Sequence, residues 1–279
     1  MDIKFIKMHG AGNDYIYIDM LCQNYEVDFN ELSRRISSRH FGVGGDGLVL
    51  IMASDRADFR MRMFNADGSE AEMCGNAIRC VGKYLFDYGY LKKKTFSIET
   101  MAGIKALEIG EKDRKGKVKT LTVDMGEPVL NGKDIPIGFK TNPVVDLEVM
   151  GYRGTAVSMG NPHFVIFMDE ITDRHVLIGG PNLEKDKIFP CKTNVDFIQI
   201  IDRNTVKMRV WERGSGETLA CGTGACAGVV AGVLGNLTDR SVNVHLPGGT
   251  LHIEWNENNN RVFLTGPAEE VFHGVYCYK

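Results

Sequence analysis

Short runs of alternating or β-branched apolar residues recur along the first half of the chain and predict strands. Runs of this kind, bounded by turn residues, are typical of half-buried strands. The predicted strands cover residues 3–8, 15–19, 47–52, 59–64, 96–99, 105–109 and 118–124. Residues 30–39 predict one surface helix. Because the turns are tight and glycine-rich and long helices are few, we expect a strand-rich α+β fold without parallel βαβ winding.

Two helix-like runs rich in small residues each follow a Cys-Gly pair. They cover residues 76–88, after Cys74-Gly75, and residues 223–234, after Cys221-Gly222. We therefore expect one central apolar helix in each half of the chain, beginning just after a cysteine.

The chain repeats itself. Residues 61–75 and 208–222 align at an offset of 147 without a gap, and Met, Arg, Glu, Cys and Gly coincide within them. Four weaker similarities occur in the same order: residues 12–18 with 160–167, 46–49 with 196–199, 96–103 with 242–249, and 121–126 with 262–266. Five similarities in one order predict two related halves of about 140 residues each.

Composition and charge are those of an ordinary globular protein. Of the 279 residues, 43% are hydrophobic and 25% are charged, with a formal net charge of -3. This balance excludes wholesale disorder and gives no electrostatic reason to expect nucleic acid or an anionic membrane as partner. The start of the chain has no signal-like apolar core, and no stretch approaches the roughly 20 apolar residues of a bilayer span, so we expect a cytoplasmic protein. The lysine-rich residues 112–119 predict a solvated turn.

The cysteines and glycines exclude several kinds of site. The seven cysteines are an odd number in a chain of this size, which predicts free thiols and no disulfide scaffold. No CxxC is present, so neither a zinc site nor a thioredoxin-type site is expected, and no metal is predicted. The glycine-rich residues 42–47 lack the Gly-Lys-Ser/Thr of a phosphate loop. Cys80 and Cys226 lie inside the predicted helices and are expected in the core.

Cys74 and Cys221 stand at helix starts, which gives them a possible chemical use. The positive end of the helix dipole favours thiolate, and the free amides of the first turn can hold an anion. If the halves face each other across a pseudo-twofold axis, the two cysteines meet in one cleft. A thiolate and a thiol on opposite faces of a carbon can invert it by removing one proton and returning another, without pyridoxal phosphate or metal. A single cysteine before glycine is more often packing, but the matched pair favours catalysis.

The residues around both cysteines resemble one family. Asn65-Ala66-Asp67-Gly68-Ser69 with Cys74-Gly75-Asn76-Ala77-Ile78-Arg79, and Trp211-Glu212-Arg213-Gly214 with Cys221-Gly222-Thr223-Gly224, are similar to the two cysteine motifs of diaminopimelate epimerases. Residues 7–14, 159–163 and 193–196 resemble the family as well. The similarity extends from residue 4 to about residue 267.

The resemblance implies a fold and an activity. Each half would be a β-barrel-like sheet wrapped around a central α-helix, and the C-terminal strand would pack back onto the first half. The expected domains are residues 1–121 with 267–279, and residues 122–266. The implied reaction interconverts LL- and meso-2,6-diaminopimelate without a cofactor, in lysine and peptidoglycan precursor biosynthesis, and a homodimer is implied.

The resemblance also implies roles for individual residues. Cys74 and Cys221 would be the acid/base pair, with His163 assisting Cys74 and Glu212 assisting Cys221. The backbone amides of four residues would hold the reacting carboxylate: Gly75, Asn76, Gly222 and Thr223. Six side chains would hold mainly the distal amino acid end: Asn13, Asn65, Asn161, Asn194, Glu212 and Arg213. Arg213 can donate two hydrogen bonds to one carboxylate, and Glu212 can form an ion pair with an ammonium, which suits a substrate charged at both ends.

The sequence departs from the family pattern at two positions, and two alternative functions remain. Gly47 stands where some members have glutamine, so it is not expected to contact substrate, and Phe272 stands where members often have a tyrosine of the dimer face. A related two-cysteine racemase acting on histidine or proline is one alternative, although a proline-type substrate has no second ammonium for Glu212. A non-catalytic protein that senses oxidation through the two thiols is the other.

Overall fold

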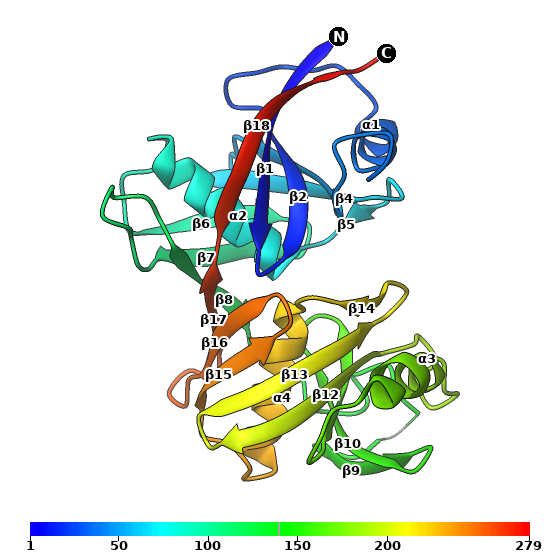
Figure 1. The fold of residues 1–279 in the computed structure, drawn as a ribbon. Helices are drawn as coiled ribbons and strands as arrows, with labels where there is room; N and C mark the ends of the chain where they lie inside the picture. Colours follow the sequence, from blue (N-terminus) through cyan, green and yellow to red (C-terminus); the bar gives the residue numbers. More distant parts are fainter. Residues whose placement is uncertain (139) are drawn as a thin grey trace. The chain divides into compact units, whose positions relative to one another are not determined.

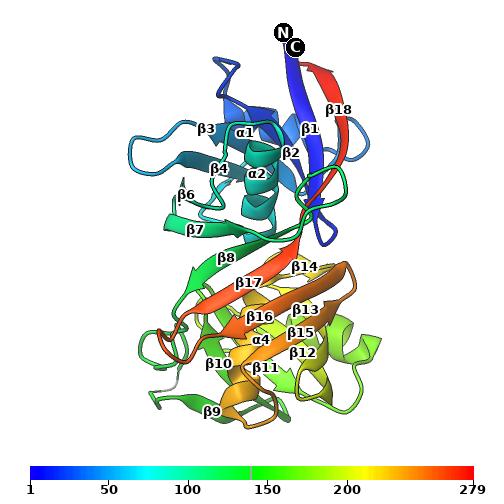
Figure 2. The ribbon, with the colours of Figure 1, turned by 90° about the vertical axis from the view of Figure 1, so that its left-hand side faces the viewer.

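The chain folds into two compact units in a computed structural model that describes residues 1–138 and 140–279 (Figures 1 and 2). Unit 1 comprises Met1–Val123 and Thr265–Lys279, and unit 2 comprises Asp124–Leu264. The two chain ends lie together in unit 1, where the Met1 ammonium donates to the Tyr278 carbonyl at 2.7 Å.

Unit 1 is one mixed sheet in which each strand pairs with the next. The order is β18 (Glu269–Cys277), β1 (Asp2–Gly10), β2 (Asn13–Asp19), β3 (Gly47–Met52), β4 (Phe59–Asn65), β6 (Thr95–Thr100), β7 (Gly103–Ile109) and β8 (Thr120–Gly126). The short β5 (Glu70–Ala71) forms a hairpin with β4.

Unit 2 repeats the same order of pairing. It runs through β9 (Val144–Val149), β10 (Tyr152–Ser158), β11 (Pro162–Phe167), β12 (Asn194–Asp202), β13 (Thr205–Glu212), β15 (Ser241–Leu246), β16 (Gly249–Trp255) and β17 (Val262–Pro267). The hairpin partner of β13 is β14 (Gly216–Thr218). The strand-rich α+β class expected from the sequence is confirmed.

The strand registers define the repeat residue by residue. Leu48 faces Phe64 in unit 1 and Val195 faces Trp211 in unit 2, so the offset of 147 extends back into β3 and β12. The sequence alignment of Asp46 with Asp196 is therefore wrong by three residues, because both segments share the same apolar pattern. The residue of unit 1 that corresponds to Asp196 is Val49.

Each unit encloses one long buried helix, α2 (Gly75–Asp87) or α4 (Gly222–Leu234). Helix α2 contacts β1, β2 and β7, and α4 contacts the strands from β10 to β12 together with β15 and β16, so both sheets curve around their helices (Figure 2). Glycines in the two helices let the strands of each sheet pack closely against them. A Cβ on Gly82 would lie 2.5 Å from Leu121, and one on Gly228 would lie 2.5 Å from Ile198.

Two expectations about local structure were wrong. Helix α1 (Phe29–Ile36), capped at its start by Asp28, ends three residues before the expected Arg39, because the amides of Val43 and Gly44 fold back onto the Ile36 carbonyl. Parallel pairing also occurs, as β2 with β3, β4 with β6, β11 with β12 and β13 with β15. The chain crosses from β4 to the parallel β6 through α2, since parallel neighbours need a long crossover connection. The sequence did not show that the strands of these parallel pairs are neighbours. Between β11 and β12 in the chain, η1 (Arg174–Gly179) and α3 (Gly180–Glu184) were not predicted.

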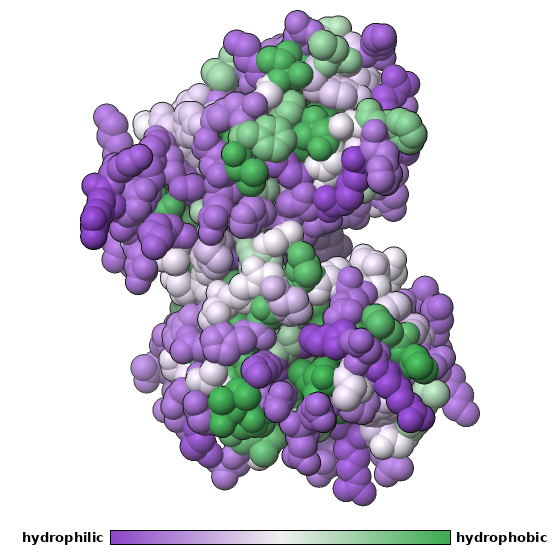
Figure 3. Space-filling model, in the orientation of Figure 1, coloured by the Kyte–Doolittle hydropathy of each residue, from purple (hydrophilic) through white to green (hydrophobic). Residues whose placement is uncertain are grey.

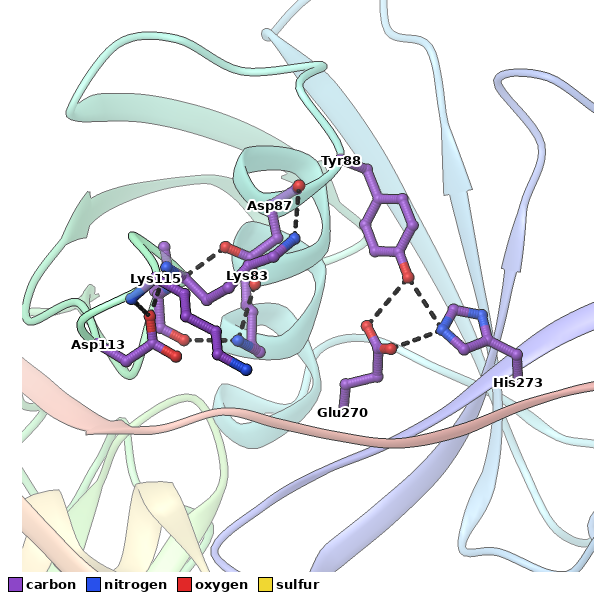
Figure 4. Close-up of polar contacts among 9 residues, drawn as sticks. Lys83, Asp87, Tyr88, Asp113, Lys115, Glu270 and His273 are labelled. Carbon is purple, nitrogen blue, oxygen red and sulfur yellow. Dashed lines mark hydrogen bonds and ion pairs between the residues drawn. The ribbon is translucent and has the colours of Figure 1, made fainter.

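Polar contacts hold the C-terminal end of α2 (Figure 4). Lys83 pairs with Asp87 at 2.8 Å, and Asp87 accepts from the amide of Val118 at 2.9 Å. This anchors the predicted lysine-rich turn, whose residues 112–117 are exposed as expected. On the other side, Tyr88 donates to Glu270 of β18 at 3.1 Å, and burial and the charge of Glu270 raise the pKa of Tyr88 to about 12.

Most of the surface seen in Figure 3 is polar, with scattered apolar patches. On β18, the side chains of Val271, Phe272 and Val275 are exposed. Phe272 packs edge-on against the buried Phe5, with ring centroids 5.9 Å apart. Within the described residues, no helix has the length and apolar character needed to cross a bilayer.

Candidate active site

In unit 1, a tight hairpin places Asn13 beside Cys74. The turn between β1 and β2 contains Ala11 and Gly12, both with positive φ (52° and 82°), so that Asn13 is the first residue of β2. The Cys74 thiol donates to Asn13 Oδ1 at 3.2 Å. Cys74 itself is half-buried and has an extended backbone directly before the first turn of α2. The glycine of the turn is thus part of how the sequence brings these two side chains together.

A buried arginine supports the first turn of α2. Arg79 donates to the Gly75 carbonyl and to Asn76 Oδ1, both at 2.8 Å, and Asn76 donates weakly to Asn13 Oδ1 at 3.4 Å. A Cβ on Gly10 would lie 3.0 Å from Arg79 Nη2, so the glycine admits the guanidinium. The expected residues Asn13, Asn76 and Cys74 therefore form one connected group, which Arg79 holds from behind.

Asn65 is placed near this group but makes other contacts. It ends β4 opposite Gly47, and its amide donates to Ser69 Oγ at 3.0 Å. Asp46 accepts from the Asn13 amide at 2.7 Å, so the Asn13 side chain is held at both of its ends. Asp46 and Arg79 are supporting residues to which the sequence reasoning gave no role.

In unit 2, Cys221 takes the matching place before α4, but it is buried. The residue is only 5% exposed, and its sulfur lies 3.5 Å from Thr223 Oγ1. Burial, and then the nearby carboxylates of Glu212 and Asp196, hold the pKa of the Cys221 thiol well above its ordinary value. The helix dipole was expected to favour thiolate, but for Cys221 desolvation and like charge act in the opposite direction and determine the net shift of the pKa.

Glu212 ends β13 and faces the same cysteine. Its carboxylate accepts a short hydrogen bond from the Thr218 hydroxyl in the β13–β14 hairpin. Burial raises the pKa of Glu212, while hydrogen bonds from Thr218 and Cys221 and the charge of His163 act in the opposite direction. A carboxyl group with a raised pKa beside a thiol is suited to proton exchange with it.

His163 lies fully buried on β11. Its Nδ1 is 2.8 Å from Asp196 Oδ2, and its Nε2 is 3.2 Å from Asn161 Oδ1. Asn194 donates to the Pro162 carbonyl at 2.8 Å and accepts from the Arg213 amide at 2.9 Å, so it connects β11 to the end of β13. The guanidinium of Arg213 is exposed and donates to the Cys191 carbonyl at 3.2 Å.

The predicted site residues thus divide between the units. Unit 1 holds five of them: Asn13, Asn65, Cys74, Gly75 and Asn76. Unit 2 holds the other eight: Asn161, His163, Asn194, Glu212, Arg213, Cys221, Gly222 and Thr223. His163 therefore belongs to the unit of Cys221 and Glu212, whereas the cysteine it was expected to assist belongs to unit 1. All seven cysteines are free, as predicted. Across the part of the chain described, no group of three or more His, Cys, Asp or Glu side chains is arranged to hold a metal.

Two units, each with a cysteine before an enclosed helix, define a known fold. A PhzF-family protein of Enterococcus faecalis matches over the full length of both chains with a TM-score of 0.70 and 16% identity. A hydroxyproline epimerase of Agrobacterium vitis matches over 98% of this chain and 90% of its own, with a TM-score of 0.68 and 13% identity. At such identities the likeness establishes the fold alone.

Sequence relatives define the family more narrowly. The family model described as diaminopimelate epimerase matches residues 5–131 and 155–271. Diaminopimelate epimerases of Acetivibrio thermocellus and Methanococcus maripaludis (strain C5) are 54% and 55% identical over 277 and 276 residues, which covers 98% of this chain and 98% and 99% of theirs. The chain belongs to the diaminopimelate epimerase family, which confirms the resemblance seen in the sequence. It is thus an isomerase of the epimerase type, which argues against the oxidation-sensor alternative, and the racemase alternative is not favoured.

Proposed function

We propose that this chain interconverts LL- and meso-2,6-diaminopimelate with Cys74 and Cys221 as the two proton-transferring groups. The observation that carries the proposal is the matched position of the two cysteines. Each has an extended backbone and directly precedes the first turn of a buried helix, at equivalent points of two repeated units. Relatives more than 50% identical that are named for this reaction support the same substrate.

The two cysteines act as acid and base in this mechanism. Inversion needs one base and one acid on opposite faces of the α-carbon. The raised pKa of Cys221 favours its thiol, which suits Cys221 to return the proton to the α-carbon after Cys74 has removed one from the opposite face. When the reaction runs in reverse and Cys221 acts as the base, the Glu212 carboxylate takes the proton of the Cys221 thiol. His163 assists Cys74. Because the thiols supply both proton transfers, the reaction requires no cofactor.

Helix starts and amide side chains bind the substrate. The first-turn amides of Gly75, Asn76, Gly222 and Thr223 hold the reacting carboxylate and stabilise the negative charge that develops when the α-proton leaves. Arg213 binds the distal carboxylate, and Glu212 and the asparagines 13, 65, 161 and 194 bind the remaining polar groups. The exposed guanidinium of Arg213, whose backbone amide is fixed by Asn194, supports this assignment.

The cellular setting is part of the same proposal. The chain acts in the cytoplasm, where seven free cysteines stay reduced, and it supplies lysine and peptidoglycan precursors. A homodimer forms through β18, whose exposed Val271, Phe272 and Val275 support this surface. A net charge of -3 gives no reason to propose nucleic acid as a partner.

Proton NMR of the reduced protein with LL-diaminopimelate in deuterium oxide tests the function. We expect the meso isomer to appear with deuterium at one α-carbon. Cys74→Ala and Cys221→Ala should each abolish epimerisation, whereas Cys277→Ala, at an exposed thiol, should not. Full activity in either of the first two variants would contradict the two-base mechanism. The absence of both exchange and meso product in the wild type would contradict the substrate.

A further inference from the structure

Asp196 binds the proposed assisting histidine from the adjacent strand. β11 and β12 are parallel, with His163 opposite Asn194, so Asp196 lies two residues further along and on the same face as Asn194. Its Oδ2 is 2.8 Å from His163 Nδ1, and neither side chain is exposed to solvent. A carboxylate at this distance accepts the Nδ1 proton.

The second oxygen of the Asp196 carboxylate makes no hydrogen bond that would stabilise the fold. Asp196 Oδ1 is buried and is among the three buried side-chain polar atoms of the described chain that have no hydrogen-bond partner. It lies against the first turn of α4, where a Cβ on Gly224 would be 2.6 Å away. A buried carboxylate satisfied on one side only is costly, and it needs a reason to be there.

The repeat shows that the fold does not require this charge. In unit 1, Tyr15 faces Gly47 in the same parallel pairing in which His163 faces Asn194. Val49, two residues beyond Gly47, corresponds to Asp196, and both Val49 and Tyr15 are buried. The same sheet position therefore accepts an apolar side chain in one unit and carries a histidine–carboxylate pair in the other.

We infer that Asp196 is a positioning residue for the reaction: it holds the proton on His163 Nδ1 and so leaves Nε2 as the nitrogen that exchanges a proton or hydrogen bond during turnover. This inference rests on the proposed function, in which His163 assists Cys74. Nε2 lies 3.2 Å from Oδ1 of Asn161, one of the proposed substrate-binding residues. Because an amide oxygen only accepts, this contact is a hydrogen bond when Nε2 carries a proton, as in the doubly protonated ring. When the neutral ring holds its proton on Nδ1, Nε2 is free to accept from another donor.

Asp196→Asn tests the inference, because the amide has the same shape but can donate to Nδ1. We expect kcat to fall by about 10- to 100-fold, the loss typical of removing such an outer partner, with KM changed less than about threefold. In a His163→Gln background the same substitution should lower kcat little further, because Asp196 acts only through His163. Asp124→Asn is the matched control: it removes a carboxylate of unit 2 that pairs with Arg261 at 2.7 Å, and it should leave kcat unchanged.

Nitrogen-15 NMR of the resting protein separates this inference from the proposed function. In the wild type, the His163 signals should report a proton on Nδ1, and Asp196→Asn should move the proton of the neutral ring to Nε2. A wild-type ring protonated on Nε2 alone would overturn the inference whatever the substrate proves to be, and so would an unchanged kcat in folded Asp196→Asn. If that variant does not fold, the wild-type spectrum decides. Failure of the wild type to epimerise diaminopimelate would instead count against the proposed function.

Discussion

Thr218 donates a short hydrogen bond to the carboxylate of Glu212 across the β13–β14 hairpin, three residues before Cys221. At the offset of 147, Ala71 and Asn65 stand at the matching positions of unit 1, so the pair is specific to unit 2. The hydroxyl opposes the effect of burial, which raises the pKa of Glu212. It therefore adjusts the protonation of the group proposed to exchange protons with Cys221.

Removing this hydroxyl should make the enzyme more sensitive to acid. In Thr218→Val the pKa of Glu212 should rise further, because a bond to the charged form is lost. We expect the acidic limb of the kcat/KM profile to move to higher pH by about one pH unit, the size of one hydrogen bond to a charged group. Thr218→Ser keeps the donor and should retain the wild-type profile. Identical profiles for the valine and serine variants would show that the hydroxyl has no such role.

Arg79 should be a major source of stability in unit 1. It is fully buried and donates to the Gly75 carbonyl, to Asn76 Oδ1 and, at 3.2 Å, to the Pro267 carbonyl. Arg79→Met leaves these acceptors without their donor, and we expect the free energy of unfolding to fall by about 3 kcal/mol. Urea unfolding measures this, with Arg114→Met in the exposed turn as the control. Similar unfolding curves for the two variants would contradict the assignment.

The sequence predicted the repeated architecture well because the repeat is visible in patterns of residues close together in the chain. The strands, the two helices after the cysteines and the offset of 147 all depend on nearby residues. Arg62 pairs with Glu70 and Arg209 with Glu217 at the same Nε–Oε1 distance of 2.7 Å, so even an ion pair follows the predicted alignment. Features that depend on distant neighbours were missed. The end of α1 is fixed by the backbone of Val43 and Gly44, and the parallel pairings join strands separated by helices.

The site shows the same division. Motifs identified the cysteines and their glycines, but the environment of each cysteine depends on the tertiary structure. Cys221 stands at a helix start, from which thiolate was expected, yet burial beside Glu212 and Asp196 reverses the direction of its pKa shift. The importance of Asp196 could not be seen in the sequence, because the apolar pattern aligns Asp196 with Asp46, whereas its structural counterpart is Val49.

The two proposed catalytic thiols should differ in reactivity. Cys74 is half-buried, whereas Cys221 is nearly inaccessible and its pKa is raised by burial and then by neighbouring carboxylates. Because alkylation requires thiolate and access, iodoacetamide at pH 7.5 should modify Cys74 at least about tenfold faster than Cys221. Peptide mapping by mass spectrometry measures both rates in one sample, with exposed Cys277 as an internal standard. Equal rates would contradict the assignment of Cys221 as the resting acid.

Buried thiols should limit the stability of the protein in alkali. Burial raises the pKa of Cys80 to about 11, from an ordinary value near 9, and the pKa of Cys221 is raised in the same direction. Below pH 9 both thiols are protonated in the folded and the unfolded chain, so their contribution is constant. Above pH 9 only the unfolded chain loses these protons, and each thiol should then lower the free energy of unfolding by about 1.4 kcal/mol per pH unit, until the pH passes the pKa of the folded state.

Urea unfolding between pH 8 and pH 10 measures this slope. Cys80→Ala should reduce the decline between pH 9 and pH 10, even though its stability at pH 8 falls because a cavity forms. Cys277→Ala, at an exposed position, should decline as steeply as the wild type. The decisive quantity is the difference in slope. The cavity lowers the free energy of unfolding equally at every pH, whereas proton loss from the unfolded chain lowers it only above pH 9. Parallel declines for Cys80→Ala and the wild type would show that Cys80 remains protonated in both states over this range.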